Sequence, residues 1–132
     1  MTMLQTYIND LLMRGCDDWI QAAEVASIVI EFGKAKIPEE IQELSLEIIR
    51  HVVREGLMEL GDVDVAGEWE TREGFRKWNL TDEEAISRVE REWKALGRNP
   101  GLWEICWLRN TDRGNVRGEE LFKQEDQSWR MG

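Results

Sequence analysis

The chain has 132 residues, and its 27 acidic against 17 basic side chains give it a net charge of −10. A chain of this length forms one domain and buries roughly two thirds of its unfolded surface, so it needs no disulfide or metal to fold. No apolar run approaches the ~20 residues that cross a bilayer, which excludes a membrane-spanning helix. The acidic balance argues against a protein that binds nucleic acid or anionic membranes, and favours simple solubility or a cationic protein partner.

The N-terminal part of the chain predicts two helices. The apolar residues between positions 4 and 12 follow helical spacing, and Gly15 suits the position just past a helix end. A second helix is expected from Trp19 to about Phe32, with Asp17 or Asp18 as its N-terminal cap. Because apolar residues nearly encircle this segment, we expect it to be buried.

A third helix and a strand follow. Pro38 fits the first position of a helix, and Gly56 terminates it. Residues 57–65 are short, apolar and partly alternating, which predicts a strand. Residues 1–65 would thus hold three helices and the first strand.

Residues 66–101 are predicted to form an insertion. The stretch 66–79 is mixed and acidic, so we expect irregular structure there. Thr81 and Glu84 have the spacing of a capping box and begin a fourth helix, which stops at Gly97.

The last part of the chain predicts a second strand and a short C-terminal segment over residues 102–123. Residues 102–108 are rich in strand-forming side chains, and alternation places three of them on one face: Trp103, Ile105 and Trp107. Asn110, Asp112 and Gly114 predict a turn, and residues 115–124 a short helix. The polar end, 124–132, is expected to fray.

The order of these elements is that of a winged helix-turn-helix. We therefore predict a mainly α (α+β) single domain over 1–132. It has a three-helix core and a two-stranded antiparallel hairpin interrupted by the helical insertion. The test of this topology is whether residues 58–63 pair with residues 104–109.

The third helix carries an acidic face formed by Glu40, Glu43 and Glu47, which share one side of the helix at i, i+3 and i+7. In a DNA reader of this kind, the third helix enters the major groove and meets phosphates. Carboxylates in that place repel a polyanion, so the predicted partner is a basic protein. An ordinary solvated helix face is the competing interpretation.

A second acidic patch is predicted from Asp62, Asp64, Glu68, Trp69 and Glu70. The chain has seven Trp among eleven aromatic residues, and we expect at least one of them to be exposed at an interface. A carboxylate metal site is the alternative for this patch. The acids lack the ordered Asp/Asn/Gly spacing of a calcium loop, however, so no metal ion and no cofactor is expected.

No catalytic constellation is expected, so we predict that the chain is not an enzyme. His51 is the only histidine, which excludes a His-based metal cluster. Cys16 and Cys106 are far apart and in no CxxC arrangement, which is typical of buried free thiols. The basic residues of the fourth helix are Arg88, Arg91, Lys94 and Arg98. Pairing with acids of the same helix explains much of this stripe, and a contact with RNA or an acidic protein is the alternative.

Three segments resemble a pattern in small bacterial immunity proteins of contact-dependent growth inhibition and related polymorphic toxin systems: 56–63 (GLMELGDV), 74–78 (GFRKW) and 105–111 (ICWLRNT). The match covers roughly residues 56–111. The resemblance implies a cytoplasmic inhibitor that neutralises a cognate toxin, often a basic nuclease domain, by blocking its active site. It assigns no binding motif to particular positions.

Two functional hypotheses follow. The first is an immunity protein that binds a basic toxin through the two acidic patches around exposed Trp side chains. The second is a winged-helix, transcription-linked regulator that contacts DNA from the side of Arg109, Arg113 and Arg117. The N-terminus lacks a basic start and a long apolar stretch, so we expect a cytoplasmic protein with no membrane partner.

Overall fold

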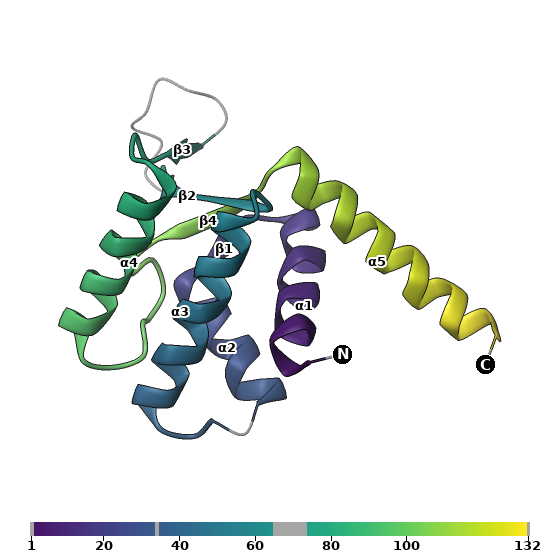
Figure 1. Cartoon of the computed structure of the whole chain (residues 1–132), viewed down its shortest axis with the longest axis horizontal. Coiled ribbons are helices and arrows are strands. Elements are labelled where there is room, and N and C mark those ends of the chain that lie inside the picture. Colours follow the sequence, from purple (N-terminus) through teal and green to yellow (C-terminus); the bar gives the residue numbers. More distant parts are fainter. Residues whose placement is uncertain (1, 34, 65–73, 132) are drawn as a thin grey trace.

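The structure is a computed structural model that describes residues 2–33, 35–64 and 74–131, with side chains as far as residue 126. Over these ranges the protein is α+β, with five helices and a four-stranded antiparallel sheet. In Figure 1 the strands cross one end of a group of three helices, and the helices α4 and α5 lie on opposite sides of that group.

Helix α1 (Met3–Asp17) is longer than predicted. The side chain of Thr2 caps it by accepting a hydrogen bond from the Gln5 N–H at 3.1 Å. The prediction that Gly15 lies just past its end is wrong. A Cβ atom at Gly15 would lie 2.3 Å from Oδ1 of the buried Asn110, so this glycine permits close packing inside the helix.

The second helix begins later than predicted. Residues Ile20–Gln21 form the short strand β1, and α2 (Ala22–Phe32) starts only after them. The Asp18 carboxylate accepts the Trp19 N–H at 2.7 Å instead of capping α2, and Gln21 is the N-cap residue. Ile20 turns to the core, where it pairs with Leu108, and this pairing outweighs the helical pattern.

The remaining core elements fit the predictions closely. Helix α3 (Pro38–Arg54) has Pro38 in its first turn. Strand β2 (Met58–Val63) follows it. Helix α4 (Asp82–Leu96) starts at the predicted capping box of Thr81 and Glu84, and Gly97 ends it with a left-handed φ of 69°.

The sheet has the strand order β1-β4-β2-β3. Strand β4 (Trp107–Asn110) pairs with β2 from Met58↔Asn110 to Gly61↔Trp107, so the predicted pairing of these two segments is confirmed. Strand β3 (Phe75–Lys77) was expected to be irregular, but it pairs with the outer edge of β2.

The segment before β4 is a loop, and the prediction that residues 102–106 belong to a strand is wrong. Trp103 and Ile105 have φ values of 65° and 72°, which are incompatible with a β ladder. The two side chains therefore do not share a sheet face with Trp107.

Helix α5 (Asp112–Met131) replaces the predicted turn and continues through the segment expected to fray. Thr111 Oγ1 accepts the Gly114 N–H at 3.1 Å and so favours a helix start at this point. Glycines allow α5 to pack tightly, since a Cβ at Gly118 would lie 2.4 Å from Cys16 Sγ. Farther along, α5 projects from the body, as Figure 1 shows.

The core lies between α1, α2, α3 and the inner side of the sheet, and α4 adds Trp93. These side chains are fully or almost fully buried, among them Leu11, Val29, Ile49, Val52, Trp93 and Leu108. Burying this much apolar surface on one side of α3 leaves its polar side facing solvent.

Candidate functional site

The acidic face of α3, formed by Glu40, Glu43 and Glu47, lies on the surface. All three residues are exposed. Arg50 Nη1 lies 3.6 Å from Glu43 Oε1, but the Glu43 side chain keeps 67% of its surface exposed. Among the described residues, neither Glu40 nor Glu47 forms an ion pair. Most of the negative charge of this face is therefore available to a partner.

Helix α4 lies along one flank of the acidic face and runs antiparallel to α3. Arg54, at the end of α3, bonds to Glu83 at the start of α4 through both guanidinium and carboxylate branches at 2.8 and 3.0 Å. Four residues earlier on α3, Arg50 lies 3.3 Å from Glu90. Helices α3 and α4 thus form one surface, and α4, which belongs to the predicted insertion, covers one flank of α3.

The basic stripe of α4 is largely neutralised inside the protein. Arg88 pairs with Glu92 at 3.2 Å and Lys94 with Glu90 at 2.9 Å, as the intrahelical interpretation predicts. The hydrogen bond from Lys94, and after it that from Arg50, lowers the pKa of Glu90. Arg91 is exposed and forms no ion pair among the described residues, so this part of the stripe remains available to a partner.

In the second predicted acidic patch, the carboxylate of Asp62 is bonded within the protein. Asp62 Oδ2 accepts the indole N–H of Trp78 at 2.9 Å, and the Arg88 guanidinium lies 3.8 Å from the centre of the same ring. Asp62 therefore holds the end of the sheet against α4. Asp64 is half-buried, and its backbone N–H donates to Gly74 O at 2.7 Å. The other predicted members, Glu68, Trp69 and Glu70, lie outside the described residues.

The loop Gly101–Ile105 presents two apolar side chains to solvent, Leu102 at 68% and Trp103 at 65% exposure. Its backbone is fixed by polar contacts. Arg98 bonds to both carboxylate oxygens of Glu104 at 2.7 and 2.8 Å, and the Gly101 N–H donates to Glu104 at 2.6 Å. These contacts lower the pKa of Glu104 to about 2, the Arg98 bond contributing most.

A second contact ties this loop to the body. The Trp103 N–H donates to Gln21 Oε1 at 2.6 Å, across 82 residues of sequence. The loop is thus held at β1 and near the end of α4, and a shallow surface pocket lies between the end of α4 and the start of α3. That pocket is lined by Pro38, Glu39, Gln42, Lys94, Gly97 and Arg98.

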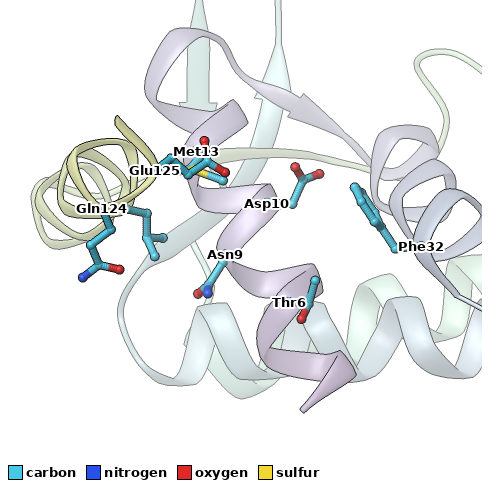
Figure 2. Close-up of a pocket in the computed structure, with 8 residues that line it drawn as sticks. Thr6, Asn9, Asp10, Met13, Phe32, Gln124 and Glu125 are labelled. Carbon is cyan, nitrogen blue, oxygen red and sulfur yellow. The ribbon is translucent and has the colours of Figure 1, made fainter. Parts of the chain in front are cut away.

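An open groove of about 370 Å³ runs between α1 and α5. Figure 2 shows four residues of α1 along it, with Phe32 on one side and Gln124 and Glu125 of α5 on the other. Asp10 pairs with Arg14 at 2.8 Å. Phe32, Met13 and Leu121 provide the apolar surface, and no nucleophile lies beside a base among the residues that line the groove.

The single histidine and the two cysteines are half-buried or buried. His51 is half-buried at a shallow pocket beside Glu55 and Arg113. Within residues 2–33, 35–64 and 74–131 no group of three or more His, Cys, Asp or Glu side chains is placed to hold a metal ion. Burial raises the pKa of the thiols of both Cys16 and Cys106, which disfavours the reactive thiolate.

Two of the three arginines named in the DNA-binding hypothesis form ion pairs within the protein. Arg109 pairs with Glu59 on the neighbouring strand and lies 4.4 Å from the ring centre of Phe75. Arg117 pairs with Glu120 at 3.3 Å, whereas Arg113 is exposed at the start of α5. Arg113 and Arg117 line one shallow pocket together with Glu55 and Glu120, so the cations on this side are mixed with carboxylates.

A comparison of the chain with protein-family models, with curated proteins and with solved structures finds no match. In the part of the chain that the structure describes, none of the helices combines the length and the apolar character needed to cross a membrane.

Sequence reasoning found the acidic face but missed the exposed loop. It assigned Leu102 and Trp103 to a strand because both are strand-forming residues. The turn signal Asn99-Pro100-Gly101, and the Gly101–Glu104 spacing that lets a carboxylate accept a backbone N–H three residues earlier, could have placed a structured loop there.

Proposed function

We propose that this chain is a toxin-neutralising immunity protein, a cytoplasmic and non-enzymatic inhibitor that binds a basic toxin domain and blocks it by charge complementarity. The single observation that carries this proposal is the exposed acidic face of α3, with two of its three carboxylates free of ion pairs among the described residues.

The arrangement of elements supports a winged-helix-like description of the fold. Helix α1, strand β1, helices α2 and α3, and strands β2 and β4 occur in the winged-helix order once the intervening β3 and α4 are set aside, and β4 lies between β1 and β2 in the sheet. In such a fold the third helix docks in the major groove. Here its exposed side is acidic and α4 flanks it, so both charge and access favour a protein partner over DNA.

Charge complementarity gives this surface a physical role. A positive patch on the partner is attracted over a distance of about 8 Å at physiological salt, which raises the association rate by one or more orders of magnitude. A basic nuclease domain has such a patch because its own substrate is a polyanion. An inhibitor whose carboxylates stand in for phosphates would compete for the same surface.

The test is neutralisation in cells. The proposal predicts that a gene next to this one encodes a large exported protein with a toxic C-terminal domain; that domain is expressed with and without the chain, and growth is followed. The proposal expects growth arrest that the chain relieves, and formation of a one-to-one complex with the purified domain. Growth arrest that persists, or a neighbouring gene that encodes no toxic domain, would contradict it.

A winged-helix regulator that binds DNA is the second candidate, and it is favoured by the strand order and by the exposed Arg113. A gel-shift assay on genomic fragments over a range of salt concentrations separates the two. Specific binding that weakens steeply with salt would support the regulator. No shift, together with toxin binding, would support the inhibitor.

A further inference from the structure

The loop of residues 101–105 exposes two large apolar side chains to solvent. Leu102 and Trp103 are more exposed than any other large apolar side chains that the structure describes. Trp103 has no aromatic or cation contact among the described residues. Exposed Trp is enriched among the residues that dominate binding energy at protein interfaces.

The backbone of this loop adopts a conformation that its residues disfavour. Trp103 and Ile105 both have positive φ values, 65° and 72°. Gly and Asn adopt a positive φ more easily, and a positive φ is rare for a β-branched residue such as Ile105. Such outliers persist only where surrounding contacts hold them, and they cluster at functional sites.

The contacts that hold the loop also make it rigid. Glu104 is fixed by Arg98 and by the Gly101 N–H, while Gln21 accepts the Trp103 N–H. Insertion of the indole into a partner would therefore cost this loop little additional backbone entropy. Rigid presentation of this kind raises affinity chiefly by lowering the ordering cost.

The loop is linked through Arg98 to the start of α3, the helix that carries the acidic face. Arg98 and Gly97 share a shallow pocket with Pro38 and Glu39 at the start of α3, and Arg98 bonds to the neighbour of Trp103. Glu39, which lines this pocket, is exposed. A partner that contacts both the loop and α3 would therefore need an apolar pocket and a cationic rim.

We infer that the loop is a preformed anchor that inserts Leu102 and Trp103 into an apolar pocket, rimmed by Lys or Arg, on the same basic protein that contacts the acidic face. This inference rests on the proposed function. The acidic face speeds the encounter, and the anchor slows the dissociation of the complex.

The test is the kinetics of binding of the purified toxin domain to the full chain and to Trp103→Ala. The anchor role expects a dissociation rate constant at least about 30-fold higher for Trp103→Ala, with an association rate constant within about twofold of the wild type. Leu102→Ala should show a smaller change in the same direction. Phe122→Ala is the matched control because Phe122 is an exposed aromatic residue on α5.

The outcomes separate the two proposals. If the wild-type chain does not bind the domain, the proposed function fails and this inference fails with it. If the wild type binds and Trp103→Ala dissociates at the same rate, only the anchor is refuted. Size-exclusion chromatography adds a check, because a dimer of the free chain that Trp103→Ala dissolves would assign the loop to self-association and overturn the inference. An unfolding midpoint within about 3 °C of the wild type confirms that the variant folds.

Discussion

Reversing two charges on the acidic face gives a quantitative test of its role. The variant Glu40→Lys/Glu47→Lys changes the two carboxylates that form no ion pair among the described residues, so internal bonds remain intact. Each replacement adds two charge units, so the net charge rises from −10 to −6. The matched control is Glu119→Lys/Glu125→Lys on α5, which has the same net charge.

The expected magnitude follows from Coulomb's law. Two unit charges about 8 Å apart in water interact by about 0.5 kcal/mol, and physiological salt reduces this to about 0.2 kcal/mol. Four charge units that act on one or two partner cations then change the encounter free energy by about 0.8–1.6 kcal/mol. This corresponds to association slower by about 4- to 15-fold.

The assay is stopped-flow association with the toxin domain at several salt concentrations. The α3 variant should associate more slowly than the α5 control, and the difference should shrink as salt rises. Equal slowing of both variants would mean that only net charge matters. Unchanged association of the α3 variant would refute the reasoning about this face.

Three further predictions concern the loop, the helix packing and the thiols. Bonds from Arg98 and Gly101 hold the pKa of Glu104 at about 2, below its ordinary 4.5, so their stabilising effect is full above pH 4.5 and is lost as pH falls toward 2. The NMR shift of the Gly101 amide should therefore titrate near pH 2 in the wild type and nearer pH 4.5 in Arg98→Ala. Gly118→Val should destabilise the chain by about 1–3 kcal/mol in urea unfolding because its Cβ would meet Cys16 Sγ and Leu12 O at 2.4 and 2.8 Å, and an unchanged midpoint would contradict the packing of α5 on α1. Cys106 is buried with a raised pKa, so it should react with a thiol reagent only on unfolding, whereas the half-buried Cys16 should react slowly in the native protein; rapid labelling of Cys106 would contradict this.

Local signals predicted the elements whose ends are set by local chemistry. Pro38, the capping box of Thr81 and Glu84, and Gly97 each act on backbone groups within one helical turn, so α3 and α4 begin or end where the sequence indicates. The acidic face follows from helical spacing alone for the same reason.

Long-range packing decided the elements that sequence reasoning missed. Ile20 and Gln21 form a strand because β4, nearly 90 residues later, pairs with them. Gly15 looks like a helix terminator, but it serves the close approach of Asn110. Local composition predicts a strand at Trp103, and the Gln21 contact that holds its loop lies 82 residues away, so no local pattern reveals it.

Hydrogen exchange of the chain, free and bound to the toxin domain, identifies the residues that form the interface. We expect slower amide exchange on binding over residues 40–47 of α3 and over residues 101–105, with unchanged exchange over residues 112–126 of α5. Protection confined to α5 and the groove beside α1, with none on α3, would contradict this expectation.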